Sequence, residues 1–197
     1  MSLHHMSYPG TISLQPETLV SVMTEICLGF ASQGFGKILI ISSHGGNQMW
    51  TDMAARRIFD KTGAKILLLK TVWTKNVEDN WEEYLKAGSN GSGHAGETET
   101  SIMMALGYPV NPNKLPKEPT KWRIDLPDFS SMLGTGALKK EPRISGLSTM
   151  GTYNVEDICD GYMGGPSKAS AETGEKILEN WSDNLLELLL QYDQLKT

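Results

Sequence analysis

Hydrophobic positions in the first part of the chain follow two alternating patterns. Between residues 16 and 33, apolar side chains recur every three or four positions, as they do on one face of a helix. These residues are Leu19, Val22, Met23, Ile26 and Phe30. Pro16 and Glu17 suit the first turn, because proline needs no amide partner there and a carboxylate interacts favourably with the helix dipole. The short apolar run Lys37–Ile41 then predicts a strand buried on both faces.

A helical pattern followed by a strand pattern occurs a second time between residues 48 and 72. A helix is predicted from about Gln48 to Lys61, and Gly63 ends it. The run from Lys65 to Val72 is again rich in apolar residues and predicts a second strand. Alternating helices and strands are typical of a parallel sheet with right-handed crossovers. We therefore expect one α/β domain over residues 1–197, with a largely parallel central sheet.

The second half of the chain has weaker patterns. Residues 74–93 are polar and predict a loop with one short helix near residues 81–86, and residues 97–107 predict a further helix. Residues 108–162 are rich in proline and glycine and predict an irregular region, whereas residues 167–196 predict a long helix. The apolar stripe of that last helix consists of Leu178, Trp181, Leu185 and Leu188.

Composition narrows the class of protein. The chain of 197 residues is 39% hydrophobic and 21% charged, which is typical of a globular domain. A net charge of −5 gives no reason to expect nucleic acid or an anionic membrane as a partner. No apolar run approaches the roughly 20 residues of a membrane span, and no export leader is visible. Cys27 lies among apolar residues of a predicted helix and is interpreted as a reduced core residue. We expect a cytoplasmic protein.

His44 is the first candidate for chemistry, because it comes directly after a buried strand. Ligands of open α/β sheets bind beyond the carboxyl ends of the strands. The glycines at 45 and 46 allow a tight turn and a close approach to a ligand. The alternative is a histidine that only caps the next helix, and the residues by themselves leave both interpretations open.

The second candidate is the segment His94–Ser101, which places a histidine and two carboxylates at the start of a helix. Helical spacing puts Glu99 on the same face as the apolar residues Ile102, Met103 and Leu106. We therefore expect Glu99 to be buried and to need a partner, which is an arginine, backbone amides or a metal ion. Glu97, on another side near His94, is a candidate general base, and its alternative is an acid that only meets the helix dipole.

The sequence argues against two other functions, dinucleotide binding and serine hydrolysis. Residues 91–96 match the G-x-G-x-x-G pattern of dinucleotide-binding proteins, but a polar loop precedes them and no acid follows at the required spacing. The chain contains no G-x-S-x-G sequence, which argues against a serine hydrolase of the α/β type.

Four segments together resemble the creatininase family. Residues 8–14 are similar to its F/Y-P-G-T-x-S stretch, and residues 42–47 to its N-G-H-G-G-N loop. Residues 94–101 match its H-A-G-E-x-E-T-S motif at every fixed position. Residues 164–174 resemble its late G-D-P…A-x-E-x-G segment. The similarities span nearly the whole chain in the order that the family has.

The resemblance implies a three-layer α/β/α fold and a metal-dependent amidohydrolase that cleaves an amide or cyclic-amide C–N bond with metal-activated water. It implies two divalent ions (zinc, manganese or iron) in the full-length parent, a small-molecule amide substrate and a closed homo-oligomer. By matching positions, His44 and Glu99 would be metal ligands. His94 would polarise or protonate the substrate, and Glu97 would lie beside the water or the metal. We expect these side chains to converge at the carboxyl ends of the strands.

The chain departs from the family pattern at several positions. The early E-x-H…D segment, which supplies three further ligands, is absent. Gly46 stands where creatinine-hydrolysing members have a glutamate, and Asn90 where they have a tryptophan. Gly165 replaces the aspartate of the late motif. These differences argue against creatinine and leave open a formamide on a nucleotide precursor or a peptide bond in a cofactor precursor.

Two functional hypotheses therefore remain open. The first is a C–N hydrolase whose full-length parent is active. The second is a truncated or degenerate family member that folds and oligomerises without catalysis. Since few of the family's ligands are present, we expect the chain as given to bind metal weakly and to be close to inactive. His4 and His5 lie near the start, with no acid before Glu17.

Overall fold

The computed structural model describes residues 2–69, 81–91, 93–117, 161–162 and 164–195. The chain divides into two compact units. The first unit contains residues 1–73 and 184–197, and the second contains residues 74–183. Helix α7 (Ala171–Asp193) begins in the second unit and ends in the first. The expectation of a single domain stays a prediction.

The first unit contains the predicted helices and strands. A 3-10 turn, η1 (Leu3–His5), precedes α1 (Pro16–Ser32), β1 (Lys37–Ile41), α2 (Gln48–Thr62) and β2 (Lys65–Leu69). The two strands pair in parallel, with Lys37 opposite Lys65 and Ile41 opposite Leu69. The predicted parallel pairing is thus confirmed, while residues 70–72 of the expected second strand lie outside the described residues.

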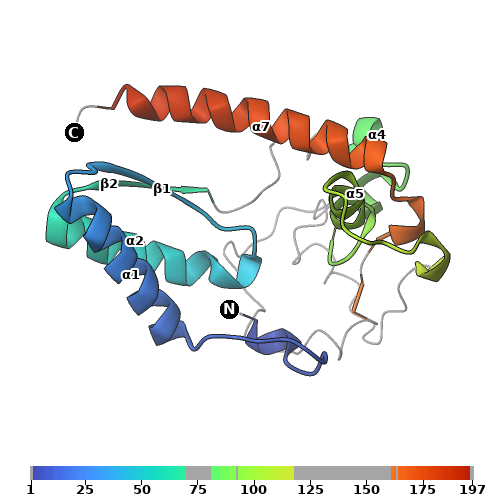
Figure 1. The fold of residues 1–197 in the computed structure, drawn as a ribbon, viewed down its shortest axis with the longest axis horizontal. Coiled ribbons are helices and arrows are strands. Elements are labelled where there is room, and N and C mark those ends of the chain that lie inside the picture. Colours follow the sequence, from blue (N-terminus) through green and yellow to red (C-terminus); the bar gives the residue numbers. More distant parts are fainter. Residues whose placement is uncertain (1, 70–80, 92, 118–160, 163, 196–197) are drawn as a thin grey trace, which may run out of the picture. The chain divides into compact units, whose positions relative to one another are not determined.

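Helices cover the two strands on both faces within this unit. Figure 1 shows β1 and β2 with α1 and α2 on one side and the last turns of α7 on the other. This is the three-layer α/β/α arrangement that the sequence led us to expect. The strand residues are half-buried, and Ile41 is 44% exposed, so the expectation of complete burial on both faces was wrong. Within the described residues each strand pairs only with the other.

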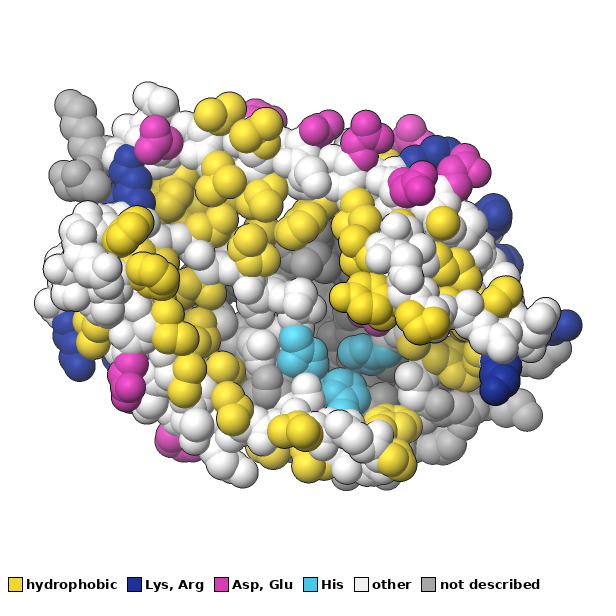
Figure 2. All heavy atoms as spheres, in the orientation of Figure 1, with side chains coloured by type: hydrophobic (Ala, Val, Ile, Leu, Met, Phe, Trp, Pro, Cys, Tyr) yellow, Lys and Arg dark blue, Asp and Glu magenta, His cyan; other side chains and the backbone are white. Residues whose placement is uncertain are grey.

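The face of α1 that packs on α2 is not the apolar stripe that predicted the helix. Its buried residues are Val20, Thr24 and Cys27, and those of α2 are Thr51, Ala54 and Ile58. The residues Val22, Ile26 and Phe30 are 44–55% exposed, and Figure 2 shows hydrophobic side chains on the surface over α1. Cys27 is buried and free, as predicted, and burial raises the pKa of its thiol.

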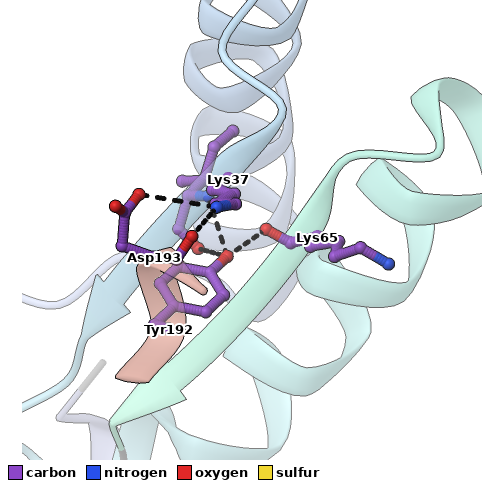
Figure 3. A network of polar contacts seen from close by, with 5 residues as sticks. Lys37, Lys65, Tyr192 and Asp193 are labelled. Carbon is purple, nitrogen blue, oxygen red and sulfur yellow. Dashed lines mark hydrogen bonds and ion pairs between the residues drawn. The ribbon is translucent and has the colours of Figure 1, made fainter. Parts of the chain in front are cut away.

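The end of α7 is fastened to both strands through Tyr192 (Figure 3). Its hydroxyl accepts a hydrogen bond from the Ile38 amide at 3.1 Å and also contacts the carbonyl oxygens of Ile38 and Lys65. Beside it, the Lys37 ammonium lies 3.5 Å from an Asp193 carboxylate oxygen. Tyr192 is buried, and this burial raises the pKa of its hydroxyl. These contacts fix the outer helix against the amino-terminal ends of β1 and β2.

The second unit is built around α5 (Glu97–Ala105) and the start of α7. The other elements described there are α4 (Trp81–Tyr84), η3 (Gly88–Gly91), η4 (Pro112–Lys114) and η6 (Pro166–Lys168). A Cβ atom built on Gly174 would lie 2.1 Å from the Ser101 carbonyl oxygen, so α7 passes α5 at backbone contact. The amide of Ser170 also donates to the Ser101 hydroxyl at 3.1 Å. Most of the predicted irregular region, residues 118–160, lies outside the described residues.

The described helices include none that is both long enough and apolar enough to cross a membrane.

Candidate metal and catalytic residues

His44 lies at the carboxyl end of β1, as predicted. The preceding Ser42 continues the strand pairing, because its amide donates to the Leu69 carbonyl at 2.8 Å. The Ser42 hydroxyl then donates to the carbonyl of His44 at 3.3 Å, which fixes the turn. His44 is extended and begins the 3-10 turn Gly45–Asn47, and its side chain makes no capping hydrogen bond there. This geometry favours the ligand-binding interpretation of His44 over the capping alternative.

Two further histidines accompany His44 in the first unit. One nitrogen from each of His4, His5 and His44 lies within 4.8 Å of the others, which is a group that can hold a metal ion. The rings of His4 and His44 are stacked, with their centroids 5.7 Å apart and an interplanar angle of 9°. His4 is buried, and the other two are partly buried. Sequence analysis missed this group because nothing in the spacing shows that residues 4 and 5 return to the loop after β1.

In the second unit, Glu97 is completely buried and bound to the backbone. Its two carboxylate oxygens accept hydrogen bonds from the amides of Lys86 and Ala87, at 2.9 and 2.8 Å. A Cβ atom on Gly91 would lie 3.0 Å from one of these oxygens, so a glycine at this position leaves space for the carboxylate. These contacts satisfy a buried charge. They also make Glu97 the residue that attaches the start of α5 to the loop that precedes it.

Glu99 is exposed, so the expectation of a buried Glu99 was wrong. The buried face of α5 instead carries Glu97, Thr98 and Ser101, which face the loop and α7, whereas Met103 and Leu106 are 43% and 56% exposed. A carboxylate oxygen of Glu99 accepts the amide of Ala95 at 2.8 Å. An acid in this position commonly reaches back to an amide before the helix and so satisfies an otherwise unused donor.

His94 is held in an unusual turn. Gly93 has φ of 132°, and Ala95 has φ of 47°, a left-handed conformation that a residue with a Cβ seldom adopts. Both polar groups of Ala95 are bound, the amide by Glu99 and the carbonyl oxygen by the Thr100 hydroxyl at 3.2 Å. Strain of this kind persists where the surrounding contacts hold it in place, and it is frequent at functional sites. The motif therefore uses its polar residues to present the partly buried His94.

The predicted site residues thus fall in the two units. His44 belongs to the first, and His94, Glu97 and Glu99 belong to the second. Their convergence in one cleft, and the metal and catalytic roles of each residue, stay predictions.

Comparison with protein families decides the class of the chain. The family model described as creatininase, creatinine amidohydrolase, matches residues 1–189. The chain belongs to the creatininase family. No curated protein matches the chain.

Solved structures of creatininases share its fold. A structure described as a creatinine amidohydrolase from Bacteroides fragilis NCTC 9343 has 22% sequence identity and a TM-score of 0.68, over 97% of this chain and 67% of that one. A mutant creatininase described as Zn-Zn type has 20% identity and a TM-score of 0.65, over 93% of this chain and 67% of that one. A manganese creatininase has 21% identity and a TM-score of 0.60, over 93% and 67%. At these identities the structures establish the fold, and the chain spans about two thirds of their length.

Proposed function

We propose that this chain is a metal-dependent amidohydrolase that hydrolyses the C–N bond of a small amide or cyclic amide. The observation that carries the proposal is His44, a metal-binding type of side chain placed at the carboxyl end of β1 together with two further imidazoles. Family membership, established by the match over residues 1–189, supplies the reaction class.

The donor atoms of the chain fit a divalent transition ion. Imidazole nitrogens suit zinc and related ions, and carboxylate oxygens serve zinc and manganese. The relatives described as Zn-Zn type and as a manganese form agree with this chemistry. Such an ion would supply a water activated for attack and would polarise the amide carbonyl. His44 and Glu99 are the proposed protein ligands, and the number of ions belongs to the proposal as well.

His94 and Glu97 have different tasks in this proposal. His94 polarises or protonates the substrate, and the left-handed turn at Ala95 fixes the direction of its backbone. The prediction that Glu97 takes part in catalysis remains open, but its burial and its two amide contacts favour a positioning role over proton transfer. A general base must reach the proton that it removes, and both oxygens of Glu97 are occupied by backbone donors.

Creatinine is not the substrate that we propose. Gly46 offers no side chain at the loop position where creatinine-hydrolysing relatives have a carboxylate, and Asn90 replaces their tryptophan. A site that lacks these groups loses contacts that would orient a small planar ring. We expect an acyclic amide or another cyclic amide to be preferred over creatinine.

The test is hydrolysis of a panel that contains creatinine, a second cyclic amide, a formamide and a dipeptide. Protein stripped with a chelator is compared with protein reloaded with Zn²⁺ or Mn²⁺. We expect turnover only after reloading. We thus expect metal binding and activity in place of weak binding and little activity, because two further imidazoles lie beside His44. His44→Ala should lower kcat/KM by about 100-fold or more, because a lost ligand removes much of the metal affinity. Glu172→Gln changes a surface carboxylate on α7 and serves as the control. Turnover that persists without metal, or that survives His44→Ala, would contradict the proposal.

A further inference from the structure

We propose that His4, His5 and His44 form a metal site of three imidazole nitrogens within the first unit. This inference rests on the proposed function in one respect, since it identifies protein ligands for a metal that the function requires. The ligands are not those of the motif alone, because two of them come from the turn η1 ahead of the first helix.

The distances between the three side chains fit one ion. Their candidate ligand atoms all lie within 4.8 Å of one another. Nitrogen ligands of a tetrahedral zinc ion lie about 2.0–2.1 Å from the metal and hence about 3.3 Å from each other. The ring centroids of His4 and His5 are 4.1 Å apart, and that of His44 is 5.7 Å from His4 and 5.8 Å from His5. Binding of one ion would draw these nitrogens together, from at most 4.8 Å to about 3.3 Å.

The backbone around η1 holds the two histidines beside the loop after β1. The His5 amide donates to the Ser2 carbonyl at 2.9 Å, which closes the turn. The Ser2 amide donates to the Ser13 hydroxyl at 2.8 Å and so ties the turn to the segment before α1. The Ser2 hydroxyl lies 3.0 Å from Nε2 of His44. The turn and the loop are therefore joined by a direct hydrogen bond.

The contact between Ser2 and His44 is also the kind that metal-binding histidines make. A ligating imidazole usually gives its second ring nitrogen to a hydrogen-bond partner, which orients the ring. The turn η1 thus supplies two ligands, His4 and His5, and the loop after β1 supplies the third, His44. Ser2, which precedes η1, orients the ring of His44.

The chemistry of the ligands selects the class of ion. Three neutral nitrogens and, in this group of described residues, no carboxylate suit Zn²⁺, Co²⁺, Ni²⁺ or Cu²⁺ and disfavour Mg²⁺ and Ca²⁺, which prefer oxygen. Three histidine ligands leave a fourth position for a further protein ligand or for water. The alternative explanation for the cluster is packing of aromatic rings, because His4 and His44 are stacked. The two explanations differ in whether the ring nitrogens matter.

The experiment therefore removes the imidazole nitrogens of His4 and His5 but keeps an aromatic ring at each position. The protein of 197 residues, without a histidine tag, is stripped of metal, and its affinity for Zn²⁺ is measured by competition with a chromophoric chelator. The double variant His4→Phe with His5→Phe keeps two aromatic rings and removes the ligands. We expect it to bind Zn²⁺ at least about 100-fold more weakly than the wild type. His94→Phe, the same exchange in the second unit, should leave the affinity unchanged. The visible spectrum of the Co²⁺ protein should show tetrahedral bands that only the double variant loses.

Each outcome decides one question. Circular dichroism of the metal-free proteins shows whether the double variant is folded, and the single variants at His4 and His5 repeat the test with a smaller change. Wild-type affinity in a folded double variant, or no Zn²⁺ binding by the wild type, would overturn the three-histidine site. Metal binding that depends on His4 and His5 without any amide hydrolysis would leave the site standing and reject the proposed function. Amide hydrolysis together with wild-type metal binding in the double variant would support the proposed function and reject the three-histidine site.

Discussion

Replacing Glu97 with glutamine tests what the buried carboxylate of the motif does. The change keeps the size of the side chain and removes its charge. One oxygen can still accept an amide, but the new NH₂ group faces the other backbone donor, either that of Lys86 or that of Ala87. A hydrogen bond to a charged group contributes about 1.5–3 kcal/mol, and a buried donor left unsatisfied costs about 1–3 kcal/mol. We expect Glu97→Gln to lower the free energy of unfolding by about 2–4 kcal/mol.

The measurement is urea unfolding followed by circular dichroism, together with hydrogen exchange at the amides of Lys86 and Ala87. Both amides should exchange faster in the variant. Glu172→Gln is the matched control, since Glu172 also lies in the first turn of a helix but is 77% exposed and forms an ion pair with Lys176. It should change the unfolding midpoint little, because exposed pairs contribute little.

A different pattern would refute this interpretation of Glu97. If Glu97→Gln kept the wild-type unfolding midpoint and amide protection and abolished turnover, the carboxylate would be catalytic and not a positioning group. A parallel loss of stability in Glu172→Gln would show that the effect comes from the helix dipole, which acts on both residues.

Three further results are expected. Gly174→Ala should lower the free energy of unfolding by about 1–3 kcal/mol through overpacking, because its Cβ would lie 2.1 Å from the Ser101 carbonyl oxygen. In the same urea experiment Gly29→Ala, whose Cβ would meet nothing within 4 Å, should raise the free energy of unfolding by up to about 1 kcal/mol. Tyr192→Phe removes the hydroxyl bound to β1 and β2 and should lower the free energy of unfolding by about 1–2 kcal/mol. Because the pKa of Tyr192 is raised in the folded protein, this loss of stability should be complete below about pH 10 and should shrink as the pH rises further. Light scattering at micromolar concentration should show an oligomer, because several large apolar side chains of α1 are exposed, and a clean monomer would contradict this.

The strands and helices of the first unit were predictable because local and tertiary preferences agree there. Lys37–Ile41 is an uninterrupted apolar run that follows a glycine-bounded turn, and the structure has a strand with these bounds. Gly63 ends α2 in a left-handed conformation, as a glycine after a helix commonly does. The parallel pairing of β1 and β2 then follows from the helix between them.

The buried face of α5 was not predictable from its hydrophobic pattern. Apolar periodicity placed Glu99 inward, yet Glu97 and Ser101 face the interior. The reason is tertiary: the amides of the preceding loop bind Glu97, and the Ser101 hydroxyl accepts the amide of Ser170. Neither partner is visible in the local sequence of the helix.

The three-histidine cluster was missed for a related reason. Its members come from a short turn near the chain start and from the loop after β1, and a hydrogen bond between Ser2 and His44 joins the two. No periodic pattern links these segments. The adjacent pair His4 and His5 was the signal in the sequence, because two neighbouring imidazoles beside a third make a metal site worth testing.

The most direct test of the proposed function is hydrolysis in isotopically labelled water. Metal-free protein and protein reloaded with Zn²⁺ or Mn²⁺ are incubated with the amide of the panel that is hydrolysed fastest. The mass of the carboxylic acid product is then measured by mass spectrometry. A metal-dependent amidohydrolase places one heavy oxygen from water in each carboxyl product, and only in the reloaded sample. Unlabelled product, equal product without metal, or no hydrolysis of any amide by the reloaded protein would contradict the account.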